Sequence, residues 1–201
     1  MLSNICPLMQ NDNQFLRETA LHFKNITKEY NEHKNELEFI YNPWIFIPIY
    51  DILGVFKNQL HFFPTIENNL IESNDYEIVS IGLSSLVKGD GANPHTDPIP
   101  IDNRFKRLHL ALQVTPTSIL NIKVNDTWIK KSWNVGRWME FKGLDKLHFP
   151  INNDEKARIV LLVDVYIGGS TKEDLYRYYN VMEGLNWINN DWEKILRDYS
   201  D

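Results

Sequence analysis

Five strand-like segments follow one another through the middle of the chain, with no helical pattern between them. They are rich in Val, Ile, Leu and aromatic residues, turn residues separate them, and they span 76–87, 107–115, 119–124, 136–141 and 157–167. Parallel neighbours would need crossover connections, which are usually helices, so a parallel sheet is disfavoured. This succession favours an antiparallel sandwich or barrel.

The N-terminal region, 1–75, has a different pattern. Apolar residues at helical spacing in a polar background predict one or two surface helices within 11–40, and 65–73 predicts a short helix that covers the sheet. Between them, the prolines and aromatic residues of 39–63 favour irregular chain or edge strands, with a short helix near Asp51.

The C-terminal region, 169–201, returns to a helical pattern. Thr171 followed three residues later by Asp174 resembles a capping box, which satisfies free backbone N–H groups at the start of a helix. Gly184 is suited to end that helix, and a last helix is expected over 191–199.

Size, charge and cysteine content limit the class of protein. A chain of 201 residues predicts a single domain, 1–201, with 76–168 as its β core. The net charge of −6 includes no basic run, so nucleic acid is not an expected partner. No apolar stretch is long enough to cross a bilayer and no signal-peptide pattern is present, so we expect a cytoplasmic protein without a membrane partner. Cys6 is the only cysteine, which leaves nitrogen and oxygen ligands for any metal.

Polar side chains gather on one face of the predicted strands, because side chains alternate across a strand. In 107–115 the polar face carries Arg107 and His109, and in 157–167 it carries Arg158 and Asp164. A third strand has small residues on one face and apolar residues on the other: Ser80, Gly82 and Ser84 against Val79, Ile81 and Leu83.

Two interpretations of these polar faces are open at this point. In an arbitrary antiparallel sheet, a polar face usually looks at water. In a closed barrel, the same face would line an interior that holds a polar ligand. Small residues beside Arg107, His109 and Arg158 are what a cavity for a small carboxylate requires.

His95 and Asp97 are two residues apart, which on extended chain places an imidazole and a carboxylate on the same side. His148 follows near the end of the strand-rich region. Two His and one carboxylate on one face of an octahedral ion leave three positions open, as in non-haem Fe(II) oxygenases. Taken alone, a His-x-Asp pair is more often a hydrogen-bonded turn than a ligand pair.

Several linked motifs together are more specific. Over roughly residues 76 to 168 the sequence resembles the aspartyl/asparaginyl β-hydroxylase family of Fe(II)- and 2-oxoglutarate-dependent dioxygenases. The matching residues occur in the order and register of that family: Ser84-Ser85-Leu86 before a glycine-containing turn, Asn93-Pro94-His95-Thr96, Arg107 to Leu112, Trp133 through Gly136 to Phe141, His148, and Arg158 to Val165.

The resemblance implies that His95 and His148 bind Fe(II), and that Arg158 with Ser84 holds the distal carboxylate of the co-substrate 2-oxoglutarate. It places Arg107 and His109 near the other end of the co-substrate. Some family members have Gly where this chain has Asp97. Because Asp97 is present, we expect a complete His95, Asp97, His148 triad, and a two-His site is the alternative.

The loop from 98 to 106 is longer than in the animal enzymes of the family and lies where a substrate could be gripped. Arg104 and Lys106 are therefore candidates for recognising an acidic or zwitterionic substrate. The family's familiar protein substrates are not assumed for this chain.

The sequence as a whole predicts a mainly β (α+β) fold, with a double-stranded β-helix (a cupin-like jelly roll) flanked by N- and C-terminal helices. The expected function is a dioxygenase that uses Fe(II), 2-oxoglutarate and O2 to hydroxylate an amino acid, a peptide or protein side chain, or an amino-acid-derived metabolite, with release of succinate and CO2. The alternative is a non-catalytic cupin-like barrel that binds a metabolite or sugar. An oxygenase without 2-oxoglutarate would leave Arg158 without a purpose.

Overall fold

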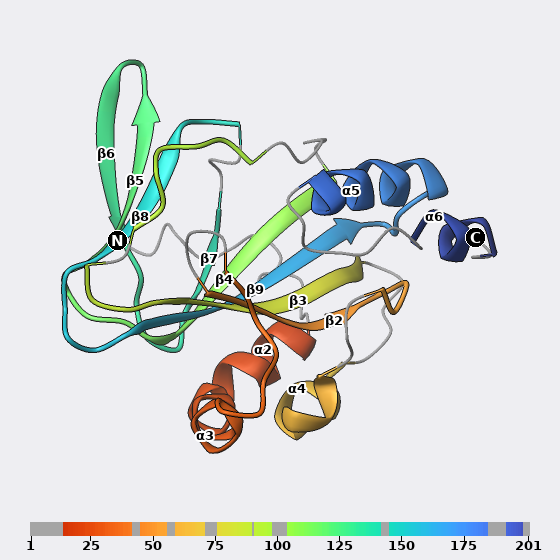
Figure 1. Cartoon of the computed structure of the whole chain (residues 1–201), viewed down its shortest axis with the longest axis horizontal. Helices are drawn as coiled ribbons and strands as arrows, with labels where there is room; N and C mark the ends of the chain where they lie inside the picture. The colour runs from red at the N-terminus through yellow and green to blue at the C-terminus, as the bar shows by residue number, and fades with distance from the viewer. Residues whose placement is uncertain are drawn as a thin grey trace.

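Two antiparallel sheets form the centre of the molecule (Figure 1). The computed structural model describes residues 14–41, 45–55, 59–70, 76–89, 91–97, 104–141, 145–184 and 192–198. The larger sheet has the strand order β1-β2-β3-β9-β4-β7 and the smaller one β6-β5-β8. The strands are β1 Ile40–Tyr41, β2 Ile45–Asp51, β3 Tyr76–Leu86, β4 Phe105–Gln113, β5 Ser118–Val124, β6 Thr127–Ser132, β7 Trp138–Glu140, β8 His148–Asn152 and β9 Arg158–Ile167.

Helices cover the larger sheet on both faces (Figure 1). On one side lie α2 Gln14–Leu21, α3 Phe23–His33 and α4 Pro64–Glu67, with the short 3-10 helix η1 Leu60–Phe62. On the other side lie the smaller sheet, α5 Lys172–Gly184 and α6 Trp192–Asp198. The mainly β fold with flanking helices is confirmed.

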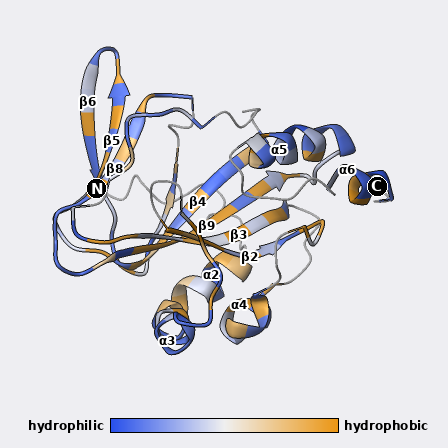
Figure 2. Ribbon diagram, in the orientation of Figure 1, coloured by the Kyte–Doolittle hydropathy of each residue, from blue (hydrophilic) through white to orange (hydrophobic). Residues whose placement is uncertain are grey.

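The outer face of the larger sheet is apolar, as the alternation of residues predicts. Leu108 and Leu110 of β4 and Leu161 and Val163 of β9 are fully buried there. Phe15 of α2 packs into the same cluster, and the mixed colouring of the helices in Figure 2 matches their half-buried position. Burial of this surface is the main force that holds α2, α3 and α4 to the sheet.

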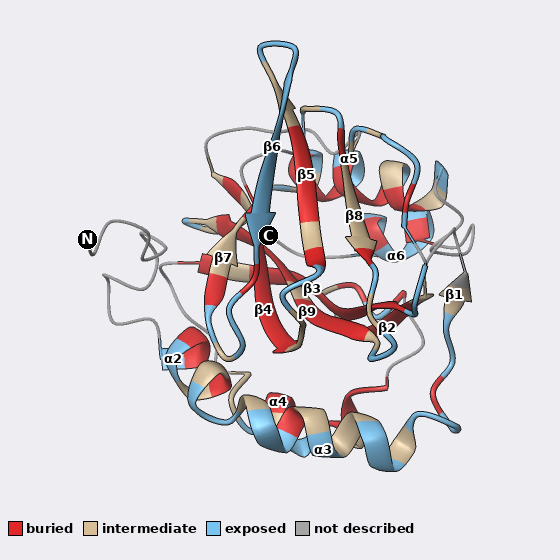
Figure 3. Cartoon of the chain, turned by 90° about the vertical axis from the view of Figure 1, so that its left-hand side faces the viewer, coloured by how far each residue is buried: buried red, intermediate tan, exposed pale blue. Residues whose placement is uncertain are grey.

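The inner face carries the polar side chains, and it is enclosed rather than exposed. Arg107 and His109 are each 6% exposed and Arg158 is 2% exposed. Leu120 and Ile122 of the smaller sheet pack towards the same interior, and Figure 3 shows β5 buried in front of the larger sheet. The interpretation that these polar faces look at water is therefore wrong, because they line an enclosed interior, as the barrel interpretation expects.

A β-bulge in β3 changes which residues share a face. The register against β9 shifts between Ile78 and Ser80. Val79 consequently packs in the inner cluster, whereas Ile81 and Leu83 pack in the outer one. The prediction that Val79 shares a face with them is wrong, because one extra residue reverses the alternation.

Two strands of the smaller sheet were not predicted from sequence. Strand β6 is exposed along its whole length, and β8 contains Pro150. A tight turn joins β5 to β6 with positive φ at Asn125 (46°) and Asp126 (61°), the conformation that matches the twist of a two-residue hairpin.

The helix expected near Asp51 is wrong, because Asp51 ends strand β2. Its carboxylate instead accepts hydrogen bonds from the backbone N–H groups of Leu53 (3.1 Å) and Val55 (3.0 Å) and from the Tyr179 hydroxyl (2.7 Å). These bonds support a turn without helical geometry.

The helices of the two flanking regions agree with the remaining predictions. Among the described residues, α2 and α3 lie within 11–40, α4 overlaps the start of the expected 65–73 segment, and the last helix, α6, lies within 191–199. At the start of α5, the Asp174 carboxylate accepts a bond from Thr171 N–H (2.9 Å), and Asp174 N–H donates to the Thr171 hydroxyl (3.2 Å), as a capping box requires. None of the described helices is long and apolar enough to cross a membrane.

Candidate metal and co-substrate site

His95, Asp97 and His148 meet at the inner face of the smaller sheet. His95 forms an isolated antiparallel bridge with His148, the first residue of β8. The Asp97 Oδ1 atom lies 3.7 Å from His95 Nε2 and 3.9 Å from His148 Nε2. One ligand atom from each residue lies within 4.8 Å of the others, so the three can surround one metal ion.

Backbone contacts set the tautomers of both histidines. The Nδ1 atom of His95 lies 2.7 Å from the Asn93 carbonyl, and the Nδ1 atom of His148 lies 2.8 Å from the Lys146 carbonyl. A carbonyl only accepts, so each Nδ1 carries a proton, and Nε2 is the ring nitrogen of each histidine that can bind a metal. Burial lowers the pKa of His148, which favours the neutral imidazole that binds a metal.

Arg107 of β4 is held by two carboxylates. Its Nη1 donates to Asp97 Oδ2 at 2.7 Å, and its Nε and Nη2 donate to the two oxygens of Asp164 at 2.8 and 2.7 Å. Burial alone would lower the pKa of Arg107, but the charges of Asp164 and Asp97 hold it above its ordinary value. Asp97 therefore gives one oxygen to Arg107 and turns the other towards the histidines.

Arg158, the first residue of β9, is buried like Arg107 but has no carboxylate partner among the described residues. Its Nη1 donates to Ser84 Oγ at 3.1 Å, its Nε has no hydrogen-bond partner, and its guanidinium lies 4.2 Å from the centre of the Trp133 ring. No carboxylate of the described residues pairs with it. Burial without a counter-charge lowers its pKa to about 9.

This unpaired cation is the structural test for an anionic co-substrate. A buried charge is costly unless it is paired, and a guanidinium binds a carboxylate through two parallel hydrogen bonds. Arg158 and Ser84 thus fit one carboxylate of 2-oxoglutarate, and the triad fits a divalent iron. The donor set of two imidazoles and one carboxylate is the set that ferrous oxygenases use.

Aromatic rings connect the triad to Arg158. Phe141 contacts His148 edge-on, with ring centres 4.6 Å apart, and lies 5.3 Å from His109. Trp133 donates from Nε1 to His109 Nδ1 at 3.3 Å and lies beneath Arg158. The proton of His109 is therefore on Nε2. Burial, with the nearby charges of Arg158 and Arg107, lowers the pKa of His109 and keeps it neutral.

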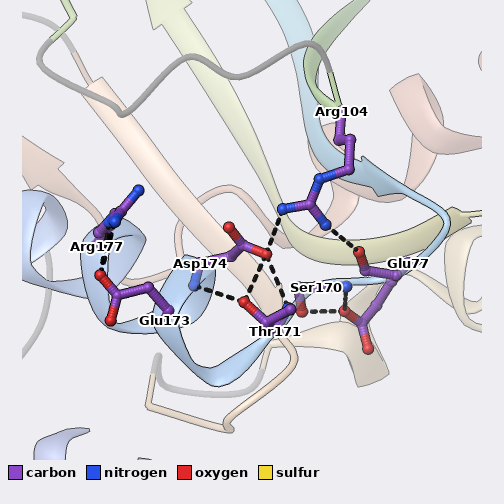
Figure 4. A network of polar contacts seen from close by, with 8 residues as sticks. Glu77, Arg104, Ser170, Thr171, Glu173, Asp174 and Arg177 are labelled. Atoms are coloured by element: carbon purple, nitrogen blue, oxygen red, sulfur yellow. Dashed lines mark hydrogen bonds and ion pairs between the residues drawn. The ribbon is translucent and has the colours of Figure 1, made fainter.

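Arg104 and Lys106 have partners of their own. Arg104 Nη2 donates to Asp174 Oδ2 at 2.7 Å and Nη1 donates to the Gly169 carbonyl at 3.2 Å, in the network that Figure 4 shows at the start of α5. Lys106 Nζ lies 3.7 Å from Glu140 Oε1 and, by strand alternation, belongs to the face of β4 opposite Arg107. Their role in substrate recognition stays a prediction.

Sequence reasoning did not identify two residues that support the site. Trp133 was noted only as a residue that matches the family, and the structure places it under Arg158 and in a hydrogen bond with His109. Tyr178 of α5 donates to Asp164 at 2.9 Å. Their contacts could not be predicted from the sequence, because both residues act between segments that are far apart in the chain.

The comparisons with known proteins agree with this geometry. A sequence profile of the aspartyl/asparaginyl beta-hydroxylase family matches residues 10–167. No protein with a curated description matches the sequence significantly.

Solved structures show the fold. A Pseudomonas putida prolyl-4-hydroxylase shares 15% identity, with 78% of this chain and 90% of that chain covered and a TM-score of 0.50. A viral collagen prolyl hydroxylase from Paramecium Bursaria Chlorella virus-1 shares 13% identity over 69% of this chain and 89% of its own, with a TM-score of 0.44. A cupin 2 barrel protein from Salinispora arenicola shares 9% identity over 73% and 91%, with a TM-score of 0.39.

At these identities a structural likeness concerns the fold alone, and the likeness to the Pseudomonas putida structure confirms the predicted double-stranded β-helix. The sequence profile extends further, because it covers most of the chain, from α2 to the end of β9. A profile of that extent, on a barrel whose interior brings two histidines, an aspartate and an unpaired arginine together, places this chain in the aspartyl/asparaginyl β-hydroxylase family of Fe(II)- and 2-oxoglutarate-dependent hydroxylases.

Proposed function

We propose that the chain binds Fe(II) through His95, Asp97 and His148, binds 2-oxoglutarate through Arg158 and Ser84, and hydroxylates a substrate of the amino-acid class. That class includes free amino acids, side chains of peptides or proteins, and amino-acid-derived metabolites. The observation that carries the proposal is the buried Arg158 guanidinium, which lacks an anionic partner among the described residues. It lies in the same interior as the three clustered metal-binding groups.

The residues of the triad divide the work of holding the metal. The two histidines offer Nε2 atoms whose direction is already set by their Nδ1 bonds. Asp97 offers one anionic oxygen, which balances part of the charge of a hard divalent cation. When bound, ferrous iron and 2-oxoglutarate supply the oxidising chemistry, which consumes O2, releases succinate and CO2, and inserts a hydroxyl group into an unactivated C–H bond.

Arg158 and Ser84 anchor the carboxylate of 2-oxoglutarate that is distal to the metal. The guanidinium can donate two parallel bonds to this carboxylate, and the Ser84 hydroxyl already bonds the guanidinium and helps to fix its direction. The Trp133 ring supports the guanidinium from below. Trp133 and Phe141 are both buried, so they also exclude water from the interior.

His109 and Arg107 receive different roles. His109 is neutral and keeps an Nε2–H donor, so it is suited to bond 2-oxoglutarate near the metal, as the family resemblance implies. Arg107 is already engaged by Asp97 and Asp164 through Nε, Nη1 and Nη2. We therefore assign Arg107 to positioning Asp97 instead of binding the co-substrate.

A succinate-release screen tests this function. Protein loaded with Fe(II) is incubated with 2-oxoglutarate and O2 against a panel of free amino acids and of peptides that contain Asp, Asn or Pro. We expect succinate above the substrate-free rate for at least one compound, and none with His148→Ala. Binding of 2-oxoglutarate with no turnover across the panel would favour the non-catalytic barrel.

A further inference from the structure

A chain of buried hydrogen bonds continues from the metal-binding triad to helix α5. Arg107 bonds Asp97 on one side and both oxygens of Asp164 on the other. The Tyr178 hydroxyl donates to Asp164 Oδ2 at 2.9 Å, and the Ser80 hydroxyl lies 2.6 Å from the Tyr178 oxygen. Because Tyr178 donates its single proton to Asp164, Ser80 is the donor in the last bond.

Helix α5, where this hydrogen-bond network ends, lies outside the part of the sequence that matches the family. The match ends at residue 167, whereas α5 begins at Lys172. Tyr178 is 1% exposed and sits in an apolar cluster with Leu175 and Met182. Burial, together with the charge of Asp164, raises the pKa of Tyr178, so its hydroxyl keeps the proton that it donates.

Stability alone does not explain such a network in this place. A buried ion pair contributes little net stability, since desolvation of both charges offsets their attraction, and apolar residues of similar volume often serve as well. The network does fix the orientation of the Arg107 guanidinium. Two parallel bonds to Asp164 hold the plane of the Arg107 guanidinium, and the remaining Nη1 arm then reaches Asp97 Oδ2.

We propose that Tyr178 and Asp164 are positioning residues of the metal site, which hold Arg107 so that Asp97 offers only Oδ1 to the metal. An Asp97 carboxylate free to turn could offer both oxygens and occupy a position needed for 2-oxoglutarate or O2. Helix α5 is then part of the metal centre, although it supplies no ligand. This inference rests on the proposed function of the triad.

The net charge of the network also supports a role at the metal site. Asp97 and Asp164 carry two negative charges against the single positive charge of Arg107. The group is therefore anionic overall, which favours a divalent cation beside it. With an amide in place of the Asp164 carboxylate, the Arg107 charge would act on Asp97 and the metal without compensation.

The test uses Tyr178→Phe and Asp164→Asn, both of which keep the shape of the side chain. Tyr179→Phe is the matched control, because it removes the same hydroxyl from the next residue of the same helix. Tyr179 is also buried, but its hydroxyl donates to Asp51 rather than to Asp164. Each full-length variant is titrated with Co(II), and the affinity and the visible absorption of the bound ion are measured with thermal unfolding.

We expect Asp164→Asn to weaken Co(II) binding by about 10- to 100-fold, as loss of a residue that orients a ligand does. Tyr178→Phe, one bond further away, should weaken it by about 3- to 10-fold. Both should shift the visible spectrum of bound Co(II). Tyr179→Phe should lower the melting temperature about as much as Tyr178→Phe, with the affinity and spectrum of the wild type.

Wild-type affinity and spectrum in a folded Tyr178→Phe and a folded Asp164→Asn would overturn the inference while leaving the triad in place. The same holds if Tyr179→Phe weakens Co(II) binding as much as Tyr178→Phe, because the effect would then be a general one of helix stability. Failure of the proposed function is distinguishable, since the wild-type protein itself would then bind no Co(II) or release no succinate.

Discussion

Arg107 and Arg158 are the same type of residue on the same inner face, yet their surroundings assign them different roles. Arg107 has two carboxylates within hydrogen-bond distance, whereas Arg158 has a serine and a tryptophan ring. Strand alternation predicted from the sequence that both lie on a polar face, and it left open whether that face looks at water or into a barrel. It could not predict their partners, because Asp97 and Asp164 approach Arg107 from two other segments of the chain.

Because Arg158 lacks an anionic partner among the described residues, replacing it should change both the thermal stability of the protein and its affinity for 2-oxoglutarate. Arg158→Met removes a buried charge that lacks a partner and keeps most of the side-chain volume. We expect the variant to unfold at a higher temperature than the ligand-free wild type. We also expect its affinity for 2-oxoglutarate to fall by about 30-fold or more, which corresponds to at least about 2 kcal/mol.

Calorimetric titration with 2-oxoglutarate and thermal unfolding measure the two effects. Arg137→Met is the control, since Arg137 is exposed and the same change there should alter neither quantity. An Arg158→Met protein that binds 2-oxoglutarate like the wild type would place the anchor of the co-substrate elsewhere.

Asp97 distinguishes a complete triad from a two-His site. Asp97→Ala removes the carboxylate oxygen that lies near both histidines and frees an arm of Arg107. We expect weaker Fe(II) affinity and loss of substrate-dependent succinate release. The exposed Asp145→Ala serves as the comparison. A variant with a normal circular dichroism spectrum and wild-type affinity and turnover would argue for a two-His site.

At the scale of elements, the strands with strong alternation could be predicted, and the weakly patterned ones could not. Strands β4 and β9 pack between two cores, so their sequences are apolar on one face and mixed on the other. Strand β6 is exposed on both faces, and β8 begins with the proposed ligand His148 and contains a proline. Neither carries a pattern that indicates a strand.

The turn before β7 allows a test of how closely the elements fit. Gly136 has φ +71°, and a Cβ atom there would lie 2.8 Å from the Phe23 ring of α3. Gly136→Ala should therefore destabilise the protein by about 2 kcal/mol, from the left-handed backbone and the contact together. Chemical unfolding measures the loss.

Gly184→Ala is the contrasting change, because an added Cβ at this last residue of α5 meets open space. It should leave the free energy of unfolding unchanged or raise it by up to about 1 kcal/mol. Equal effects of the two substitutions would contradict the predicted contact between the turn and α3.

At the scale of the whole molecule, the larger sheet separates an apolar core from a second core that also contains buried polar groups. The outer cluster under α2, α3 and α4 is built from apolar residues, whereas the inner cluster shares its space with Arg107, His109, Arg158 and Asp164. The folded protein thus carries the cost of buried polar groups at the place where ligands would bind. Ligands that supply the missing partners should stabilise it.

This linkage gives a prediction for the melting temperature. Mn(II), which is not expected to support turnover, added together with 2-oxoglutarate should raise it by about 10–20 °C when each is present at about 100 times its dissociation constant. In Arg158→Met, 2-oxoglutarate should no longer raise the melting temperature, whereas Mn(II) should still raise it. Equal shifts in both proteins would show that 2-oxoglutarate binds without Arg158.

The most direct measurement of the central claim is an anaerobic titration of the protein with Fe(II) and 2-oxoglutarate, followed by visible absorption. A keto acid that chelates ferrous iron gives a weak charge-transfer band, which neither component gives alone. We predict that the band appears with the wild-type protein only when both are present, and that it is lost in His148→Ala. If Fe(II) and 2-oxoglutarate are both in excess and no band forms, the interior does not bring the metal and the co-substrate together, and the account is contradicted.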